Sequence, residues 1–489
     1  MRVTSKMMTN NALNNINRNK ANMSTLANQY STQQKIQRPS EDPVVAVRSL
    51  KYRTSIASLE QYAKKNIPDA MSWISNTESA LSSVNTILTS MNTYFNQGAN
   101  DTLETSERDA LVQTLTEYKS QIYQCLDSDY AGRYLFTGYR TDTSLTFESD
   151  TKNLSYSISE TFKGTDLKTF TYVKSDLAYS DSSTAGDYAQ NAATSVKSYK
   201  FNLSYNEIDK LSSISYKDST GTEQNINFTM KSVEDKDVYD MSNVTGVEAV
   251  VIKETGEVIL SQEAYEKLKN AEGFQVSYDK NSFKADEVRP EHYFDCTMVD
   301  EKGVTHNYKK PGDQQIQYEV NFSQSITVNT LAKDVLDFDI INQMDDIINQ
   351  IKKVQDVENK LADVETMIKN GTYACSKDDI TELKTQLENE LALQKSVLQE
   401  QFGNGITTTT KAQASVNKAV ADLGSRYKRL ELTESRISDQ LTSFTEMLTE
   451  NDTVDMEDAI VNYTAALVAY NASLNATAKI AQNSLLDFL

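Results

Sequence analysis

Apolar residues near the start of the chain recur at seven-residue spacing between polar side chains. Ile16, Met23 and Tyr30 set this repeat, and Leu26 fills the intermediate position. A helix with so narrow an apolar face is weakly stable alone and needs a partner helix. Residues 38–43 (RPSEDP) follow, and their prolines, acids and serine predict the end of one helix and a serine-capped start of the next.

The most regular repeat of the N-terminal half begins at residue 67. Apolar residues seven apart are Ile67, Ile74, Leu81, Leu88 and Phe95, and Ala70, Thr77, Val84 and Met91 follow the first four at a distance of three. We expect this stripe to form a core within one subunit, with a boundary or kink at Pro68 and a break at 96–100. A third helix, ending near Gly132, has one apolar face: Leu111, Leu115, Tyr118 and Ile122.

From about residue 145 to residue 330 the apolar spacing changes from helical to alternating, with turn residues between short runs. The expected strands are 154–158, 170–173, 250–252, 258–260, 318–322 and 326–328. Strands 250–252 and 258–260 flank a turn and are expected to form a hairpin. Strands 318–322 and 326–328 are expected to close the region. With a short helix near 263–270, this part of the sequence predicts a mostly β insert.

Helical spacing returns near residue 338 and continues to the last residues. One stripe (Met344, Ile348, Ile351, Val354, Leu361, Val364 and Ile368) ends at Asn370-Gly371. A second (Ile380, Leu383, Leu387, Leu391, Leu398 and Phe402) is expected to end at 403–405 (GNG). A third (Leu423, Tyr427, Leu430, Ile437, Leu441, Phe444 and Leu448) is interrupted only by Glu434, and we expect it to form core.

The last helix repeats the narrow pattern of the first. Ile460, Leu467, Leu474, Ala481 and Phe488 lie seven apart, accompanied by Met456, Tyr463, Tyr470 and Thr477. Because both terminal helices are narrow-faced and polar-flanked, we expect them to pair and to use their apolar residues between subunits. The predicted assembly seam consists of Ile16, Met23, Leu26, Tyr30, Ile460, Leu467, Leu474, Leu485 and Phe488.

These elements predict a mainly α protein whose two ends form long helical, coiled-coil arms around a central, mostly β domain. The expected order is a terminal helix (1–55) that pairs with the last helix (455–489), two parts of a helical bundle (56–144 and 336–454), and a β-rich outer insert (145–335).

Charge and composition narrow the functional classes. The net charge of -20 argues against nucleic-acid binding, which needs a basic surface. Residues 1–50 carry seven basic and two acidic side chains (net +5), whereas residues 431–489 carry two basic and ten acidic ones (net -8). The ends are thus complementary, although two separately solvated faces would give the same counts. The sequence lacks an 18-residue apolar run and an apolar signal-peptide core, so we expect neither membrane insertion nor a cleaved signal.

The sequence offers little catalytic chemistry. Its two histidines, His292 and His306, form no zinc-protease motif, and we expect surface or loop positions for them. Asp235, Asp237 and Asp240 lack the glycine and distal glutamate of a calcium loop. Three scattered cysteines make neither a metal spacing nor a disulfide framework. We therefore expect no enzyme activity, no cofactor and no metal.

Four motifs, in order, resemble those of bacterial flagellins and their hook–filament junction relatives. They are 38–44 (RPSEDPV), 132–138 (GRYLFTG), 423–431 (LGSRYKRLE) and 478–489 (AKIAQNSLLDFL). The second and fourth resemble the junction proteins' G-x-Y-L-F-x-G and S-L-L-D-[YF]-L patterns. Filament flagellins typically begin with I-N-x-N, whereas this chain has Val3-Thr4-Ser5-Lys6-Met7. The resemblance therefore favours the junction branch of the family.

The resemblance implies a structural, motility-related subunit that leaves the cell through the flagellar type III export channel, with an export chaperone and without signal cleavage. Outside, it implies a ring or tubular self-assembly in the flagellum between hook-associated protein 1 and flagellin. Other interpretations remain open: the chain is a filament flagellin, or its insert is an adhesin-like binding module displayed on a flagellar scaffold. A cytoplasmic coiled-coil scaffold is a further alternative and predicts no export.

Overall fold

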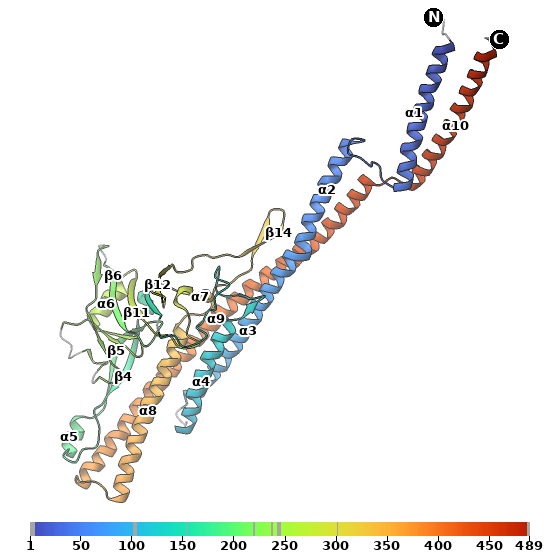
Figure 1. The fold of residues 1–489 in the computed structure, drawn as a ribbon. Helices are drawn as coiled ribbons and strands as arrows, with labels where there is room; N and C mark the ends of the chain where they lie inside the picture. Colours follow the sequence, from blue (N-terminus) through green and yellow to red (C-terminus); the bar gives the residue numbers. More distant parts are fainter. Residues whose placement is uncertain are drawn as a thin grey trace. The chain divides into compact units, whose positions relative to one another are not determined.

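The computed structural model describes residues 5–100, 105–152, 154–218, 221–235, 238–241, 246–300 and 302–486. The chain divides into two compact units. The terminal region comprises residues 1–71, 318–326 and 428–489, and the central region comprises 72–317 and 327–427. The prediction of a mainly α protein with helices from both ends and a central β-rich part is confirmed (Figure 1).

The terminal region consists of helices paired from opposite ends of the sequence. Helix α1 (Ser5–Thr32) lies beside α10 (Met456–Leu486), and α2 (Pro43–Gln61) lies along the last part of α9 (Lys377–Asp452) (Figure 1). Tyr52 packs on Phe444 with ring centroids 6.2 Å apart. Of the third C-terminal stripe, Leu430 and Ile437 are fully buried here, as expected for core.

The kink expected at Pro68 takes the form of a π-helical turn, η1 (Tyr62–Asn66), between α2 and α3 (Ile67–Gly98). The backbone amide of Ile67 donates to the carbonyl of Tyr62, five residues back. Proline has no amide hydrogen and its ring crowds the preceding turn, so a wider turn just before it keeps the helix continuous.

A β-hairpin packs against this π turn. Strands β14 (Gln317–Asn321) and β15 (Gln324–Thr327) pair only with each other. The Asn66 side-chain amide donates to the carbonyl oxygen of Glu319 at 2.7 Å, and Phe322 packs edge-on against Tyr62. These two strands were expected to close the β insert, which is wrong: the structure places them in a separate hairpin.

The core of the central region lies among helices α3, α4 (Thr105–Leu126), α8 (Asp339–Asn370) and α9. The repeat that runs from Ile67 to Phe95 is buried at every position, as expected for a core stripe. Between α8 and α9, two buried amide pairs, Gln343 with Gln401 and Gln350 with Gln394, satisfy their polar groups inside the apolar contact. Helix α8 ends at Gly371, whose φ of 64° gives the predicted left-handed cap.

Two expected helix ends are wrong. Helix α4 stops at Leu126 rather than near Gly132, and a short hairpin follows, β1 (Asp129–Tyr130) and β2 (Arg133–Tyr134). Helix α9 runs straight through residues 403–405, where we expected a break. A Cβ on Gly405 would lie 3.0–3.2 Å from Ile347 and Phe95, so this glycine serves close helix packing rather than a turn.

The insert contains two sheets within the central region. The five-stranded sheet has the order β4-β5-β10-β9-β8, antiparallel except for the β8–β9 pair, with bounds Lys168–Lys174, Thr194–Asn202, Glu257–Leu260, Ala249–Ile252 and Phe228–Lys231. The antiparallel six-stranded sheet has the order β13-β12-β3-β11-β6-β7, with bounds Thr305–Tyr308, Asp295–Val299, Ser155–Phe162, Phe274–Lys280, Lys210–Lys217 and Glu223–Asn225. The predicted hairpin of 250–252 and 258–260 is confirmed as β9–β10.

Short helices complete the insert. They are η2 (Gly164–Asp166), α5 (Ala185–Gln190), α6 (Gln262–Asn270), η4 (Pro290–His292) and α7 (Ala332–Val335). Helix α6 confirms the one expected near 263–270 and begins at the capping side chain of Ser261. Among the residues that the structure describes, no helix is long and apolar enough to cross a membrane.

Candidate assembly interface

The pairing of α1 with α10 uses the expected residues of α1. Ile16, Met23 and Leu26 are half-buried, although α1 contains no fully buried side chain among its described residues. Tyr30 stacks on Tyr463 of α10 with parallel rings whose centroids are 6.0 Å apart. A contact that leaves its apolar residues only half-buried is weaker than a closed core.

Helix α10 has two apolar stripes with different environments. The inner stripe lies against α1 and is buried or half-buried: Ala459, Tyr463, Ala466, Tyr470, Ser473 and Thr477. The outer stripe faces solvent: Ile460, Val461, Leu467, Val468 and Leu474. The sequence shows both rows, and only the structure tells which of them α1 covers.

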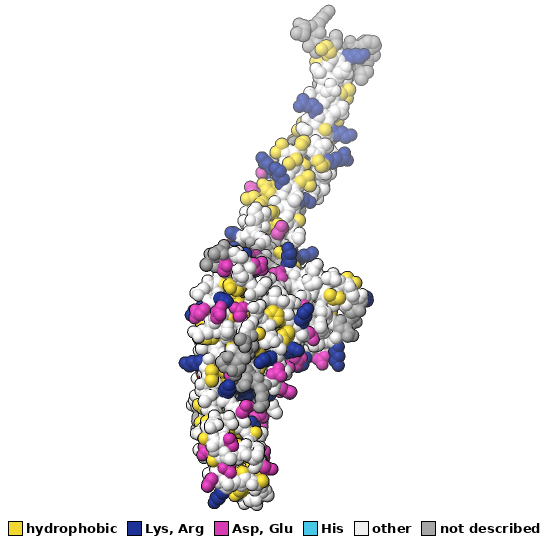
Figure 2. All heavy atoms as spheres, turned by 90° about the vertical axis from the view of Figure 1, so that its left-hand side faces the viewer, with side chains coloured by type: hydrophobic (Ala, Val, Ile, Leu, Met, Phe, Trp, Pro, Cys, Tyr) yellow, Lys and Arg dark blue, Asp and Glu magenta, His cyan; other side chains and the backbone are white. Residues whose placement is uncertain are grey.

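The predicted seam residues of α10 belong to the outer stripe. Ile460, Leu467 and Leu474 are 46%, 36% and 41% exposed, and the stripe borders a shallow apolar hollow that Val461, Thr464, Ala465, Val468 and Ala469 also line. On the face that Figure 2 shows, hydrophobic side chains are visible among Lys and Arg in the upper part, where Figure 1 draws α1, α10 and α2. Leu485 lies in α10 with its side chain outside the described set, and Phe488 lies outside the described residues.

A second exposed stripe was not predicted. Val44, Val47 and Leu50 follow one another along α2 at three-residue spacing and are all more than half exposed. Their spacing was visible in the sequence directly after the RPSEDP motif. This three-residue spacing differs from the seven-residue spacing of the predicted seam, so these residues were not included in it.

The RPSEDP motif sets the geometry between α1 and α2. Its N-cap is Asp42, whose carboxylate accepts from the backbone amides of Val44 and Val45, and not Ser40 as expected. Pro43 occupies the first helical position, which fixes the preceding Asp42 as the cap. The side chain of Glu41 accepts from the amide of Gln37, which closes the turn.

This turn is joined to the turn between α9 and α10. Gln34 and Thr453 form an isolated antiparallel bridge, and Arg53 forms an ion pair with Asp452 at 2.9 Å. Burial raises the pKa of Asp452, but hydrogen bonds from Arg53, Asn451 and Ser49 outweigh it and hold that pKa below its usual value. This ion pair joins the two turns, but Arg53 lies outside residues 1–50, so the charge complementarity of the two chain ends stays a prediction.

The second and third motifs have packing roles beside the insert, whereas most of the fourth lies outside the described side chains. Leu135 and Phe136 of the GRYLFTG segment are buried. Arg426 of the LGSRYKRLE segment donates to the backbone carbonyls of Thr327 and Asn329 at 3.2 and 3.1 Å. These side chains connect helices to the chain that enters and leaves the insert.

The two histidines lie in separate environments. His292 is buried, contrary to expectation, and burial lowers its pKa to about 4; its Nε2 lies 3.1 Å from the carbonyl oxygen of Ser144. His306 lies 3.6 Å from Asp300 near the surface. No group of three or more His, Cys, Asp or Glu among the described residues is arranged to hold a metal ion.

Sequence comparisons match both ends of the chain. Residues 3–141 match the model of the bacterial flagellin N-terminal helical region, and residues 406–489 match that of the C-terminal helical region. The flagellar hook-associated protein 3 of Salmonella typhimurium is 30% identical over 145 residues, which cover 29% of this chain and 45% of that protein. A flagellin of Clostridium tyrobutyricum is 34% identical over 122 residues, 25% of this chain and 32% of that protein. The chain thus matches less than half the length of these relatives.

Solved structures give weaker matches. A Vibrio parahaemolyticus protein described as a flagellar hook-associated protein is 14% identical with a TM-score of 0.38, covering 84% of this chain and 100% of the other. The flagellar hook-associated protein-3 of Legionella pneumophila is 13% identical with a TM-score of 0.31, covering 82% and 98%. The likeness to flagellar proteins is therefore one of sequence, at the two ends of the chain.

Proposed function

Because its two ends match the models of the bacterial flagellin N-terminal and C-terminal helical regions, we propose that this chain is a structural subunit of the bacterial flagellum, assembled at the hook–filament junction. The observation that carries the proposal is the outer stripe of α10. Ile460, Leu467 and Leu474 continue the seven-residue repeat of a packed helix, yet no helix of this chain covers them among the described residues. In the proposed assembly, helices of neighbouring copies cover this stripe.

Burial of the outer stripe supplies a driving force for assembly. Complete burial of a Leu, Ile or Val side chain contributes roughly 1.5–3 kcal/mol, and these side chains are about half covered already. Each therefore contributes about 1 kcal/mol, repeated at every contact between copies. Such a contact is too weak to hold two isolated subunits and becomes effective when several neighbours bind each subunit at once.

We propose a junction role with hook-associated protein 1 on the hook side and flagellin on the filament side, so that the ring adapts the hook to the filament. The curated relatives named flagellar hook-associated protein 3 in Salmonella typhimurium and Escherichia coli favour this role. The same proposal includes delivery by the flagellar export apparatus with a chaperone, and an extracellular location. Weakly paired terminal helices suit a chain that passes a narrow channel before it folds.

A filament role is the second candidate, favoured by the 34% identity to a flagellin. A strain that lacks the gene separates the two roles by imaging of filaments and assay of flagellin in the medium. Hooks without filaments, together with secreted flagellin monomer, are expected for the junction. Hooks without filaments and without secreted flagellin would transfer the assignment to the filament subunit or an export defect. Intact filaments would contradict both roles.

Leu467→Asp tests the outer stripe directly. A carboxylate buried without a partner costs several kcal/mol, so we expect this variant to be absent from sheared flagella while its soluble form stays folded. Asn462→Asp is the matched control, because Asn462 is exposed on α10 away from the outer stripe and receives the same charge. Incorporation of Leu467→Asp at the level of the control would contradict the role of the stripe.

A further inference from the structure

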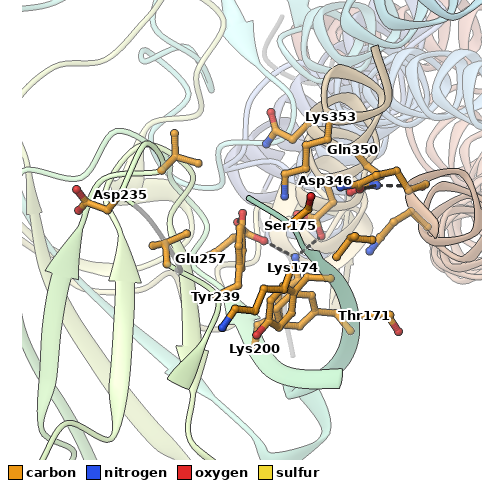
Figure 3. Close-up of a pocket in the computed structure, with 18 of the residues that line it drawn as sticks. Thr171, Lys174, Ser175, Lys200, Asp235, Tyr239, Glu257, Asp346, Gln350 and Lys353 are labelled. Carbon is orange, nitrogen blue, oxygen red and sulfur yellow. Dashed lines mark hydrogen bonds and ion pairs between the residues drawn. The ribbon is translucent and has the colours of Figure 1, made fainter. Parts of the chain in front are cut away.

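The central region contains a polar cavity of about 240 Å³ between the insert and the helical bundle. The five-stranded sheet and the loop around Tyr239 form one side, and α8 forms the other (Figure 3). Nothing in the proposed structural role requires a cavity at this place. Its lining is unusual for a junction between two packed elements, because charged and amide side chains dominate it.

Most polar groups of the cavity are already paired within the chain. Lys200 forms ion pairs with Glu257 at 2.5 Å and with Asp346 at 2.9 Å (Figure 3). The hydroxyl of Tyr239 donates to Glu257 at 3.0 Å. At the rim, Lys174 forms an ion pair with Asp240 at 2.7 Å. The carboxylates of the interior are therefore engaged, and they do not require a ligand.

Two donors on α8 are not engaged. Lys353 and Asn349 lie four residues apart, on one face of the helix, and both line the cavity. Neither makes a hydrogen bond or an ion pair with another described residue; the ammonium of Lys353 lies over the ring of Tyr239, 4.4 Å from its centroid. Burial lowers the pKa of Lys353, whose side chain is partly exposed where it lines the cavity.

Charge and size define what would satisfy these donors. In the interior of the cavity the charges of Lys200 and Lys353 balance those of Glu257 and Asp346, while the rim carries Lys174, Asp176 and Asp235, all exposed to solvent. A charged ligand in the interior would therefore leave an uncompensated charge inside the protein. A neutral ligand with oxygen acceptors would bring no charge into the cavity. Since one water occupies about 30 Å³ of liquid, the cavity holds roughly eight waters, which is the size range of a single sugar ring.

We propose that this cavity binds a neutral, hydroxyl-rich ligand of monosaccharide size, with Asn349 and Lys353 donating hydrogen bonds to its oxygens. The binding site is independent of the outer stripe of α10 and of the assembly role proposed for it.

Ligand-observed saturation-transfer NMR on the full chain tests the proposal, with methyl glucoside, methyl galactoside and methyl mannoside as probes. Glucuronate and glucosamine serve as the anionic and cationic comparators. At least one methyl hexoside is expected to bind, and more tightly than either charged sugar. Lys353→Met and Asn349→Ala each remove one donor, and we expect each to weaken binding about tenfold or more.

The control is Lys352→Met, since Lys352 is the exposed neighbour of Lys353 on α8 and does not line the cavity. Fluorescence of the single tryptophan, Trp73, shows whether each variant keeps the central region folded. If Lys353→Met does not fold, Asn349→Ala still measures how much the loss of one donor weakens sugar binding. Absence of binding by all three methyl hexosides at millimolar concentration would overturn the proposal. Equal binding by a folded donor variant and the control, or binding of glucuronate alone, would also overturn it.

Discussion

The seven-residue repeats of α3 and α10 look alike in the sequence and differ in the structure. In α3 the residues Ile67, Ile74, Leu81, Leu88 and Phe95 are fully buried, whereas the residues of the outer stripe of α10 are 36–65% exposed. Helix α3 belongs to a bundle of several helices, whereas among the described residues α1 is the one helix beside α10. An apolar repeat thus indicates that a helix packs against a partner, but it does not indicate whether that partner belongs to the same chain.

The sharpest test of this contrast replaces leucine by alanine in both helices. Leu81→Ala in α3 is expected to lower the free energy of unfolding of the central region by about 2–5 kcal/mol, because it leaves a cavity in a closed core. Leu467→Ala on the outer stripe is expected to change the stability of the soluble chain by no more than about 0.5 kcal/mol. Urea unfolding gives the first value through the fluorescence of Trp73, and loss of helical circular dichroism gives the second. A comparable loss in both variants would show that the outer stripe is already covered within the monomer.

Two carboxyls, one in each region, have pKa values shifted in opposite directions. In the central region, burial raises the pKa of Glu160 from 4.5 to about 7, although hydrogen bonds from Tyr278 and Ser204 oppose this shift. Between these pH values the unfolded chain releases a proton that the folded chain keeps, so stability falls as pH rises, by roughly 3 kcal/mol. Asp452 in the terminal region has a lowered pKa, so its smaller contribution is present at neutral pH and is lost as pH falls.

Glu160→Gln tests this prediction. The variant keeps a neutral side chain of the same shape, so the decrease in central-region stability between pH 5 and 8 should become shallower. Urea unfolding followed at Trp73 over this range measures the slope. Asp337 and Asp346 also have pKa values raised by burial, so part of the slope should remain. Parallel slopes for parent and variant would show that Glu160 is ionised in the folded chain.

The helical arms were predictable from sequence because their signal is local. Spacing alone identified α3, α8 and the terminal helices, and two short apolar runs on either side of a turn identified β9 and β10. The pairing of strands distant in sequence was not predictable, since it depends on which faces meet after the chain has folded. The Lys200–Glu257–Asp346 cluster was missed for the same reason: its members come from two strands and a helix up to 146 residues apart.

The assembly residues were predictable only in part. The spacing placed Ile16, Met23 and Leu26 on one stripe and Ile460, Leu467 and Leu474 on another. The first stripe lies against the neighbouring helix within the chain, and the second is exposed. The sequence could not distinguish these environments because both stripes have the same period and similar side chains. Their use between subunits stays a prediction.

Glycine was the residue that misled the sequence reading most directly. Residues 403–405 suggested a helix end, because Gly403, Asn404 and Gly405 directly follow Phe402, the last residue of an apolar stripe. In the structure both glycines are helical and have different surroundings. A Cβ on Gly403 would meet nothing within 4 Å, whereas one on Gly405 would press on Ile347 and Phe95.

Alanine at these two positions gives the smallest and most specific effect. Gly403→Ala should stabilise α9 by about 0.5–1 kcal/mol, since alanine favours the helix and meets open space. Gly405→Ala has the same gain in helix propensity but must displace Ile347 or Phe95. Its free energy of unfolding, measured by urea with Trp73 fluorescence, should therefore be lower than that of Gly403→Ala. If α9 were broken at 403–405, as the sequence suggested, alanine at Gly403 would bring no gain. Two neighbouring glycines thus separate backbone propensity from packing within one continuous helix.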